Sequence, residues 1–307
     1  MPPTTLTFKT ATQFIKSPED VDLSGFQSVD DKAAAVLAEY EEADLNLEGV
    51  LTLSNVAAEA VAKPYGCLYL DGLTVLSDGV ARALAEHKGG LFLNGLTSIT
   101  DVAAEALGEH KGGDLSLDGL KAVSDAVAKG LAKHDKYYDA MPDPDAEAGV
   151  GDNLYLNGLT VLPDSAAQAL SQHKGSLSLN GLTKLTHTAA AALAAHEGSL
   201  DLNGLTTLSS EVAEALVKHD KNIYTGLCLN GLTTLSDKVA AALAGYSGNL
   251  ELNGLTALSD DAAEFFAKHE GSLSLTGLTT VSKKAVESLN KSYEQINLPS
   301  FFQGGQL

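Results

Sequence analysis

The stretch Leu177–Ser199, LSLNGLTKLTHTAAAALAAHEGS, contains the unit from which almost the whole sequence is built. Further copies align on a Leu-x-Leu pattern in both directions along the chain. Seven of the eleven steps between copies are 23 residues, and a period of about 20 to 50 residues indicates a solenoid or an array. The copies start at Val21, Leu45, Leu68, Leu91, Leu115, Leu154, Leu177, Leu200, Leu227, Leu250, Leu273 and Ile296.

Each column of the repeat indicates a local structure. We number the first residue of Leu-x-Leu as position 0; positions 0 and 2 are apolar around a variable residue, which is typical of a short strand with one buried face. Position 4 is glycine in all eleven copies that continue past it. We expect the chain to turn there, either through a positive φ or because a Cβ has no room.

A short helix follows the turn in each copy. Ser or Thr at position 9 is often followed by Asp, as in Ser77-Asp78 and Ser259-Asp260, which predicts a helix N-cap with an acid in the first turn. A helix of about ten residues should follow, with small alanines and valines and a leucine on its inner side. The residue at position 19, most often His, marks the end of the helix.

Stacking is required because one strand and one short helix cannot bury their own apolar faces, whereas stacked copies bury a continuous one. The strands should pair in a parallel sheet with the helices on its other side. Strands repeat at ~4.8 Å and helices need ~10 Å, so the stack must curve. The sequence therefore predicts an α/β solenoid, a horseshoe with the parallel β-sheet on its concave face and short α-helices on its convex face.

The segment Leu68–His87, LYLDGLTVLSDGVARALAEH, resembles a leucine-rich repeat, and the resemblance extends over about residues 21 to 298. It is closest to the α-helical, cysteine-containing or ribonuclease-inhibitor-like class, as a shortened 23-residue variant of bacterial type. Leu73 and Leu96 stand where that family usually carries Asn or Cys, which bonds the backbone of the neighbouring repeat. The resemblance implies a curved interaction scaffold that binds through its concave sheet and has no catalytic activity of its own.

The repeat also predicts the domain organisation. Residues 1–20 should form an N-terminal cap, residues 21–295 an array of eleven repeats with insertions at about 135–153 and 220–226, and residues 296–307 a C-terminal cap in which Phe301 and Phe302 close the last layer. There is no signal-peptide core and no apolar run long enough to span a membrane. Since no disulfide is evident either, a cytoplasmic location is favoured.

The composition excludes several functions. Lys plus Arg is 20 and Asp plus Glu is 40, for a net charge of −20, and no basic stripe exists; electrostatics therefore disfavours nucleic acid and anionic membranes, and we predict no nucleic-acid partner and no membrane insertion. No phosphate-binding, zinc-protease or serine-hydrolase motif is present. We predict no enzymatic activity, no cofactor and no metal.

Histidine and cysteine are predicted to be structural. Seven of the eight histidines occupy position 19, where each ring can bond the last carbonyls of a helix. We expect neighbouring helices to keep these rings apart, with no Cys or carboxylate at ligand spacing, so a metal site is not predicted. Cys67 and Cys228 lie on distant strands and should be free thiols.

The candidate binding residues face the concave side, where strand positions −1, 1 and 3 carry no Lys or Arg. Position 1 is partly aromatic on four successive strands, and aromatic clusters on an exposed sheet mark protein interfaces. Carboxylates flank this row, and two tyrosines of the first insertion can approach it. The predicted partner-binding residues are Tyr69, Phe92, Ser116, Tyr155, Asp71, Asp114, Asp118, Tyr137 and Tyr138.

Purely structural interpretations of the aromatic rings and of the asparagines at position 3 are also open. The rings can simply pack on one another or under the insertion. The asparagines at position 3, such as Asn180 and Asn203, are expected to be turn residues that bond the backbone beside the glycine.

The sequence thus predicts a non-catalytic scaffold for protein–protein interaction, whose acidic, partly aromatic concave face binds a protein partner with a basic or polar surface. Two alternatives stay open. One is a glycan-binding module in which the same rings stack on sugars. The other is a purely structural repeat spacer of a larger protein, without a ligand.

Overall fold

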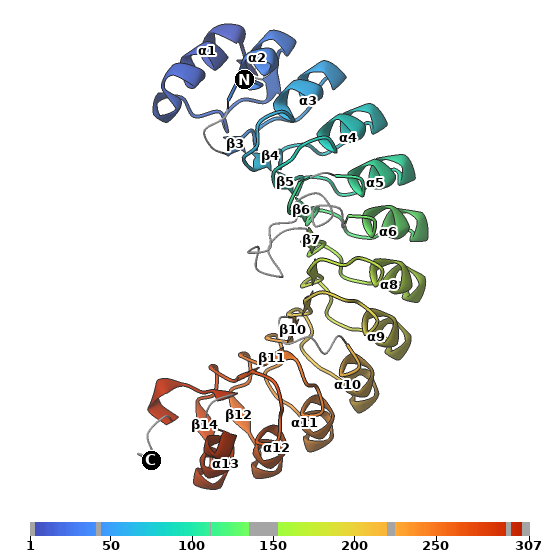
Figure 1. Ribbon diagram of the computed structural model, residues 1–307, viewed down its shortest axis with the longest axis vertical. Coiled ribbons are helices and arrows are strands. Elements are labelled where there is room, and N and C mark those ends of the chain that lie inside the picture. The colour runs from blue at the N-terminus through green and yellow to red at the C-terminus, as the bar shows by residue number, and fades with distance from the viewer. Residues whose placement is uncertain are drawn as a thin grey trace, which may run out of the picture. The chain divides into compact units, whose positions relative to one another are not determined.

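The computed structural model describes residues 4–40, 44–110, 112–134, 153–219, 225–292 and 296–302. The chain divides into two compact units, Met1–Gly158 and Leu159–Leu307. Within each unit the strands lie on one side and the helices on the other, and the helices spread more widely than the strands, so the strand side is concave (Figure 1). The predicted parallel sheet with short helices behind it is confirmed.

The N-terminal unit contains five parallel strands in the order β3-β4-β5-β6-β7, paired at the Leu-x-Leu positions. Its strands are β1 (Thr5–Leu6), β2 (Ser28–Val29), β3 (Leu45–Asn46), β4 (Leu68–Tyr69), β5 (Leu91–Phe92), β6 (Leu115–Ser116) and β7 (Leu154–Tyr155). Its helices are α1 (Phe8–Lys16), α2 (Asp31–Leu37), α3 (Asn55–Val61), α4 (Asp78–Leu84), α5 (Asp101–Leu107) and α6 (Asp125–Leu131).

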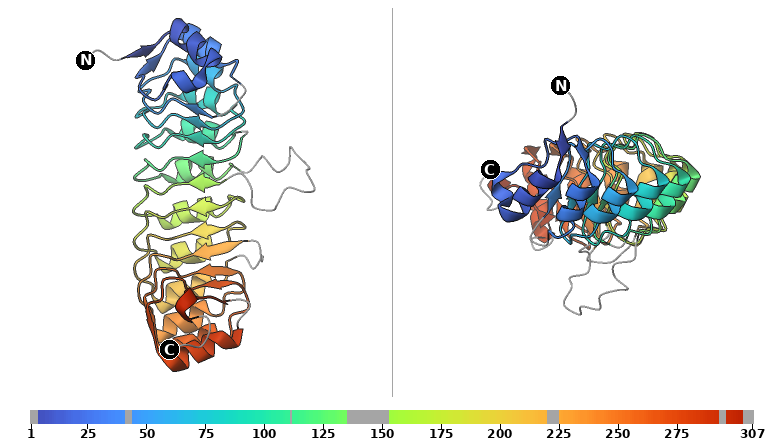
Figure 2. Two further views of the ribbon diagram at one scale, coloured as in Figure 1. Left: turned by 90° about the vertical axis from the view of Figure 1, so that its left-hand side faces the viewer. Right: turned by 90° about the horizontal axis from the view of Figure 1, so that it is seen from above.

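The C-terminal unit contains six parallel strands in the order β8-β9-β10-β11-β13-β15, and β12 pairs with β14 beside them. Figure 2 shows the strands of each unit lying side by side. The strands are β8 (Leu177–Ser178), β9 (Leu200–Asp201), β10 (Gly226–Cys228), β11 (Asn249–Glu251), β12 (Ala257–Leu258), β13 (Leu273–Ser274), β14 (Thr280–Val281) and β15 (Ile296–Asn297). The helices are α8 (Asp164–Leu170), α9 (His187–Leu193), α10 (Ser210–Leu216), α11 (Asp237–Leu243), α12 (Asp260–Phe266) and α13 (Lys283–Leu289).

The core follows the predicted columns. Leu68 and Leu70 are fully buried on the inner face of their strand, while Tyr69 between them is only half-buried. On the helices, Ala81 and Leu84 are likewise fully buried against the sheet. Most helices in the described residues have seven residues rather than about ten, because a tight turn follows the last leucine at once. Among the described residues, no helix combines the length and the apolar character needed to cross a bilayer.

The ends of the chain differ in part from the prediction. Residues 5–16 contain β1 and α1, which pair with β2 and pack on α2 at the spacing of one repeat, with Leu6 buried. Residues 21–23 are not the first strand of the sheet, because the backbone N–H of Val21 donates a hydrogen bond to the carbonyl oxygen of Pro18 in the short 3₁₀ helix Pro18–Asp20. At the other end, Phe302 is buried within a 3₁₀ turn, and the side chain of Phe301 lies outside the described residues.

The glycine at position 4 is required by contact between repeats. A Cβ on Gly95 would lie 2.0 Å from the carbonyl oxygen of Asp71, and one on Gly254 would lie 2.0 Å from that of Asn230. Neither glycine has a positive φ. Of the two reasons that we expected, lack of room is therefore the correct one: the turn of each repeat packs directly on the turn before it.

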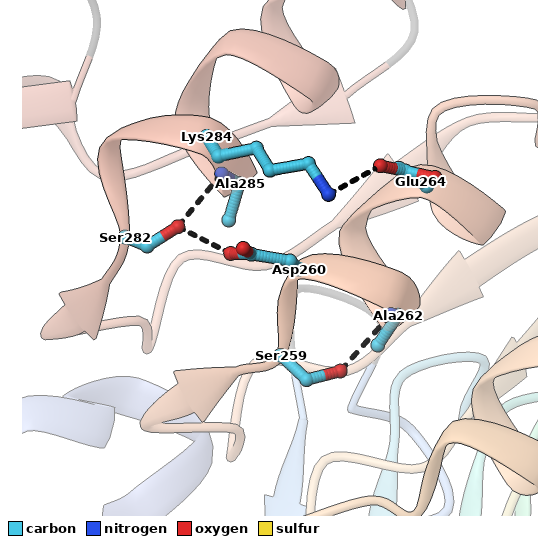
Figure 3. Close-up of polar contacts among 7 residues, drawn as sticks. All are labelled: Ser259, Asp260, Ala262, Glu264, Ser282, Lys284 and Ala285. Atoms are coloured by element: carbon cyan, nitrogen blue, oxygen red, sulfur yellow. Dashed lines mark hydrogen bonds and ion pairs between the residues drawn. The ribbon is translucent and has the colours of Figure 1, made fainter.

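A polar ladder connects the N-termini of neighbouring helices. The Oγ of Ser282 accepts a hydrogen bond from the backbone N–H of Ala285, as an N-cap does, and donates its own hydrogen to Asp260 at the start of the preceding helix (Figure 3). Thr100 makes the same pair of bonds, to Ala103 and to Asp78. The Ser/Thr-Asp signature therefore links successive repeats as well as capping single helices.

A second ladder consists of the histidines at position 19, and here one expectation was wrong. Neighbouring rings stack, with centroids 5.3 Å apart for His110 and His134 and 5.9 Å apart for His173 and His196. The rings meet because each follows the last helical turn into the interior of the unit; His87 is fully buried, and its Nδ1 lies 3.1 Å from the carbonyl oxygen of Ala62. The predicted bond to a helix-end carbonyl thus goes to the neighbouring helix.

Candidate interaction surface on the N-terminal unit

The candidate surface is the concave face of the sheet at strands β4 to β7, the face turned away from the helices, and we also call it the outer face of these strands. We call the position 1 residues of these strands the aromatic row: Tyr69, Phe92, Ser116 and Tyr155. They stand opposite one another in the sheet register. The rings of Tyr69 and Phe92 stack with centroids 4.6 Å apart and an interplanar angle of 17°. Both rings are half-buried, and Ser116 is buried. The two rings are thus held in one position on the concave face of the sheet, outside the hydrophobic core.

Local packing fixes the orientation of the stacked pair. Gly90, two residues before Phe92 and just before the strand begins, leaves room for the ring, since a Cβ there would lie 3.1 Å from it and 3.2 Å from the Sγ of Cys67. Burial raises the pKa of the Tyr69 hydroxyl, and the neighbouring thiol of Cys67 adds to this effect. Tyr69 therefore stays a neutral hydrogen-bond donor at the rim of the row.

Carboxylates lie on both sides of the aromatic row. On one side, at position −1, stand Asp44 and Asp114; on the other, at position 3, stand Glu48, Asp71 and Asp118. The Oδ1 of Asp114 accepts from Nδ2 of Asn153 at 2.8 Å, and its Oδ2 lies 3.5 Å from the hydroxyl of Tyr155. Tyr155 is thereby tied to the strand next to its own.

The position 3 side chains form a ladder between strands. Oδ1 of Asp71 accepts from the backbone N–H of Asn94 at 2.8 Å, and Oδ1 of Asn94 accepts from that of Asp118 at 2.9 Å. In the C-terminal unit, Asn180 and Asn203 do the same for the next strand, each at 2.8 Å. These residues bond the neighbouring repeat, so the interpretation of the asparagines as turn residues was incomplete.

Within the described part of the chain, no ion pair joins a carboxylate of this face to a cation. The carboxylates of Asp44, Asp71, Asp114 and Asp118 accept hydrogen bonds from neutral groups. Within the described residues, the recorded ion pairs are Lys133–Glu105 and Lys284–Glu264, and both lie on helices or helix ends. The surface therefore keeps a negative potential, which attracts a cationic partner.

The concave face of the C-terminal unit is different. Its position 1 residues include Asp201, Cys228 and Glu251, which lie opposite one another in the register. Burial raises the pKa of the Cys228 thiol, and the two carboxylates raise it further, so the thiol is a poor nucleophile. Both cysteines are free, and in the described part of the chain no group of three or more metal-ligating side chains has the geometry to hold an ion.

Two shallow grooves lie on the helical side of the N-terminal unit, and Arg82 lines both. The larger, between α3 and α4, has a volume of about 680 Å³, and Lys63, Lys88, Glu59 and Glu86 surround it. The mixture of charges around it selects no ligand class. These grooves are therefore weaker candidates than the aromatic row.

The structure places most of the predicted site residues together. Tyr69, Phe92, Ser116 and Tyr155 form one row, and Asp71, Asp114 and Asp118 flank it. Tyr137 and Tyr138 lie outside the described residues. Sequence reasoning missed that Asp71 and Asp118 also hold the strands together, although their alignment with the asparagine column was a visible signal.

Comparison with known proteins defines the class of fold. No protein-family model matches the sequence, and no curated protein matches it. A chain of the Toll–Spatzle complex from Drosophila is similar in structure, with a TM-score of 0.50, 14% identity and 90% of this chain covered. A chain of the Rad7–Elc1 complex from yeast has a TM-score of 0.39 and 17% identity, with 95% of this chain and 83% of that chain covered.

The first of these likenesses, together with the repeat, shows that the fold is a leucine-rich-repeat solenoid. At 14% identity it shows the fold alone. This chain spans 39% of the length of the Drosophila chain that it matches.

Proposed function

We propose that this chain is a non-catalytic scaffold that binds a protein partner with a basic or polar surface on the concave face of its N-terminal unit. The observation that carries the proposal is the stacked pair of Tyr69 and Phe92, half-exposed on the sheet and flanked by carboxylates that form no ion pair with another described residue. Rigid aromatic side chains supply contact area at low entropic cost. That the similar Drosophila chain was solved in a complex with a protein partner agrees with this role.

The repeat itself supports a finer classification. We infer a shortened, 23-residue variant of bacterial type, because the step between most copies is 23 residues and the polar ladder is carried by position 3. A shorter loop between strand and helix brings the turns into direct contact, which agrees with the close approach at Gly95.

A glycan partner is less well supported than a protein partner. Sugars stack on the open flat face of an aromatic ring, whereas Tyr69 and Phe92 each direct one face at the other. Binding on a glycan array that disappears in the variant described below would favour the glycan module. If neither a protein nor a glycan binds, the remaining interpretation is a purely structural repeat spacer.

The test replaces Tyr69 and Phe92 with serine, the residue that the repeat carries at the same position in Ser116 and Ser178, so that the fold is retained. The matched control replaces Val75 and Val102 with serine, since these side chains are 78% and 42% exposed and lie outside the strands. We expect partners captured by the wild type and identified by mass spectrometry to be lost with the first variant and kept with the second. Equal capture by all three proteins would exclude this site.

A further inference from the structure

The concave face of the N-terminal unit consists of three parallel rows with a definite spacing. The middle row is the aromatic row, and the carboxylate rows lie two residues to either side of it along the strands. At about 3.3 Å per residue, each carboxylate row lies about 7 Å from the middle row, and the two are about 13 Å apart. Three strand spacings of about 4.8 Å separate Tyr69 from Tyr155, a length of about 14 Å.

This pattern specifies the shape of the partner. An apolar line between two cationic lines, all facing the sheet, is what one side of an amphipathic α-helix presents, and a helix with its side chains is about 10 to 12 Å wide. An extended segment turns successive side chains to opposite faces, so it directs only one line at the sheet. At 1.5 Å per residue, about ten helical residues, or three turns, cover the aromatic row.

The carboxylates of the surface indicate which side chains the partner helix carries. Along β4 to β7, Asp114 lies beside one flank of such a helix, and Asp71 and Asp118 lie beside the other; Asp44 and Glu48 add one carboxylate to each flank in the preceding repeat, around β3. Each flank would therefore take Lys or Arg, whose long stems reach the carboxylates from the helix surface. The apolar line would take Leu, Ile or Phe on the stacked rings.

We propose that the partner element is a basic amphipathic α-helix of about three turns, lying along the aromatic row with Lys or Arg on both sides of an apolar stripe. The proposal rests on the proposed function, because it names the element that the same surface binds. It excludes two other cationic partners: an extended basic peptide and a flat basic surface without an apolar stripe.

The test uses the full chain and three synthetic peptides of fourteen residues, each with a fluorophore for anisotropy. The first contains only Leu, Lys and Ala in the order of an amphipathic helix and is cross-linked on its polar face to hold it helical. The second has the same composition in an order that destroys the stripe. The third carries Glu in place of Lys. We expect the first peptide to bind at least about tenfold more tightly than the second, and the third not to bind.

A charge variant locates the binding. Asp71, Asp114 and Asp118 are replaced with asparagine, which the repeat itself carries at the same positions in Asn94, Asn153 and Asn157, so the ladder is kept while three charges are lost. The control variant loses the same charge on the helical side, through Glu39→Gln, Glu59→Gln and Glu86→Gln, all exposed. Helix binding should weaken by about tenfold or more in the first variant and stay within about twofold in the second.

The outcomes separate the two proposals. Equal binding of the helical and reordered peptides, no binding of either, or equal effects of the two charge variants would overturn the helix proposal. If partner capture still depends on Tyr69 and Phe92 in that case, the scaffold function stands and only its helical partner is refuted. If capture is independent of both residues, the proposed function fails as well.

Discussion

Acid should destabilise this protein well above the pH at which its carboxylates are protonated. Burial, together with a smaller contribution from a neighbouring histidine, lowers the pKa of His110 and of His134 to about 3. Burial also lowers the pKa of His87 and of His269. In the unfolded chain these imidazoles return to about 6.5 and take up protons as the pH falls, while the folded protein keeps them neutral.

The direction and the size of the change in stability with pH follow from these pKa values. Between pH 6.5 and about 3 the unfolded state binds more protons than the folded state, so stability is fully present above pH 6.5 and is lost as the pH falls. For one histidine with a folded pKa of about 3, the loss between pH 7 and pH 5 is about 2 kcal/mol. His110 and His134 together lose about 4 kcal/mol, a large fraction of the stability of an ordinary domain.

The assay is urea unfolding at constant ionic strength between pH 7 and pH 5, followed by circular dichroism. A matched variant is His134→Tyr, because the repeat already places tyrosine after histidine in the buried contact between His219 and Tyr246. Tyrosine does not titrate in this range, so the variant should lose about 2 kcal/mol less than the wild type between pH 7 and pH 5.

Two results would refute this reasoning. One is a wild-type free energy of unfolding that does not change between pH 7 and pH 5, and the other is an equal slope for His134→Tyr. Asp201 acts in the opposite direction, because burial raises the pKa of its carboxyl, so that the folded state gains stability from it on acidification. The comparison between variant and wild type removes this contribution, since both proteins contain it.

Three further substitutions test the contacts between repeats, each by urea unfolding at pH 7. Gly95→Ala should destabilise by about 3 kcal/mol, since the new Cβ meets a backbone oxygen at 2.0 Å, whereas Gly25→Ala has no atom within 4 Å and should be nearly neutral; equal effects would contradict the close contact of the turns. Thr100→Val should cost about 1 to 2 kcal/mol, because it removes an N-cap and a bond to the preceding helix, and an unchanged midpoint would refute that role. Asn203→Ala should cost about 1 to 3 kcal/mol by leaving the backbone N–H of Asn230 without its acceptor, and a neutral effect would show that the ladder is dispensable.

The periodic columns predicted the elements correctly because each depends on a local rule. The buried Leu68 and Leu70 alternate with the half-buried Tyr69, and the strand Leu68–Tyr69 has one buried face. Ser77 precedes an acid and an alanine-rich segment, and it caps a helix through the backbone N–H of Val80. Helix length was less well predicted, because the tight turn that ends each helix has no sequence signal apart from the buried ring of the following histidine.

The ladders could not be predicted because they depend on distances between residues that lie one repeat apart, between 22 and 39 positions along the chain. The sequence shows that Thr100 stands one repeat after Asp78, but only the stacking of the helices brings the two oxygens within bonding distance. The histidine rings provide the clearest case. We expected neighbouring helices to separate them, yet the buried rings of His87, His110 and His134 stack one on the next, as do those of His173, His196 and His219.

The sequence predicted which residues form the candidate surface, but not the contacts among their side chains. Strand alternation placed Tyr69 and Phe92 on the outer face, and the register then makes them neighbours. Their stacking depends on room above Gly90, and the tie between Tyr155 and Asp114 depends on side-chain rotamers. Neither can be derived from a repeat pattern.

The central claim is that the outer face of β4 to β7 binds a basic partner, and hydrogen exchange tests it most directly. The exchange of backbone amides is measured by mass spectrometry on the full chain, alone and with the helical Leu-Lys peptide. We predict added protection in peptides covering residues 67–72, 90–95, 114–119 and 153–158, and unchanged exchange in helices α3 to α6. Protection of the helices, or no change on any of these strands at saturating peptide, would contradict the account.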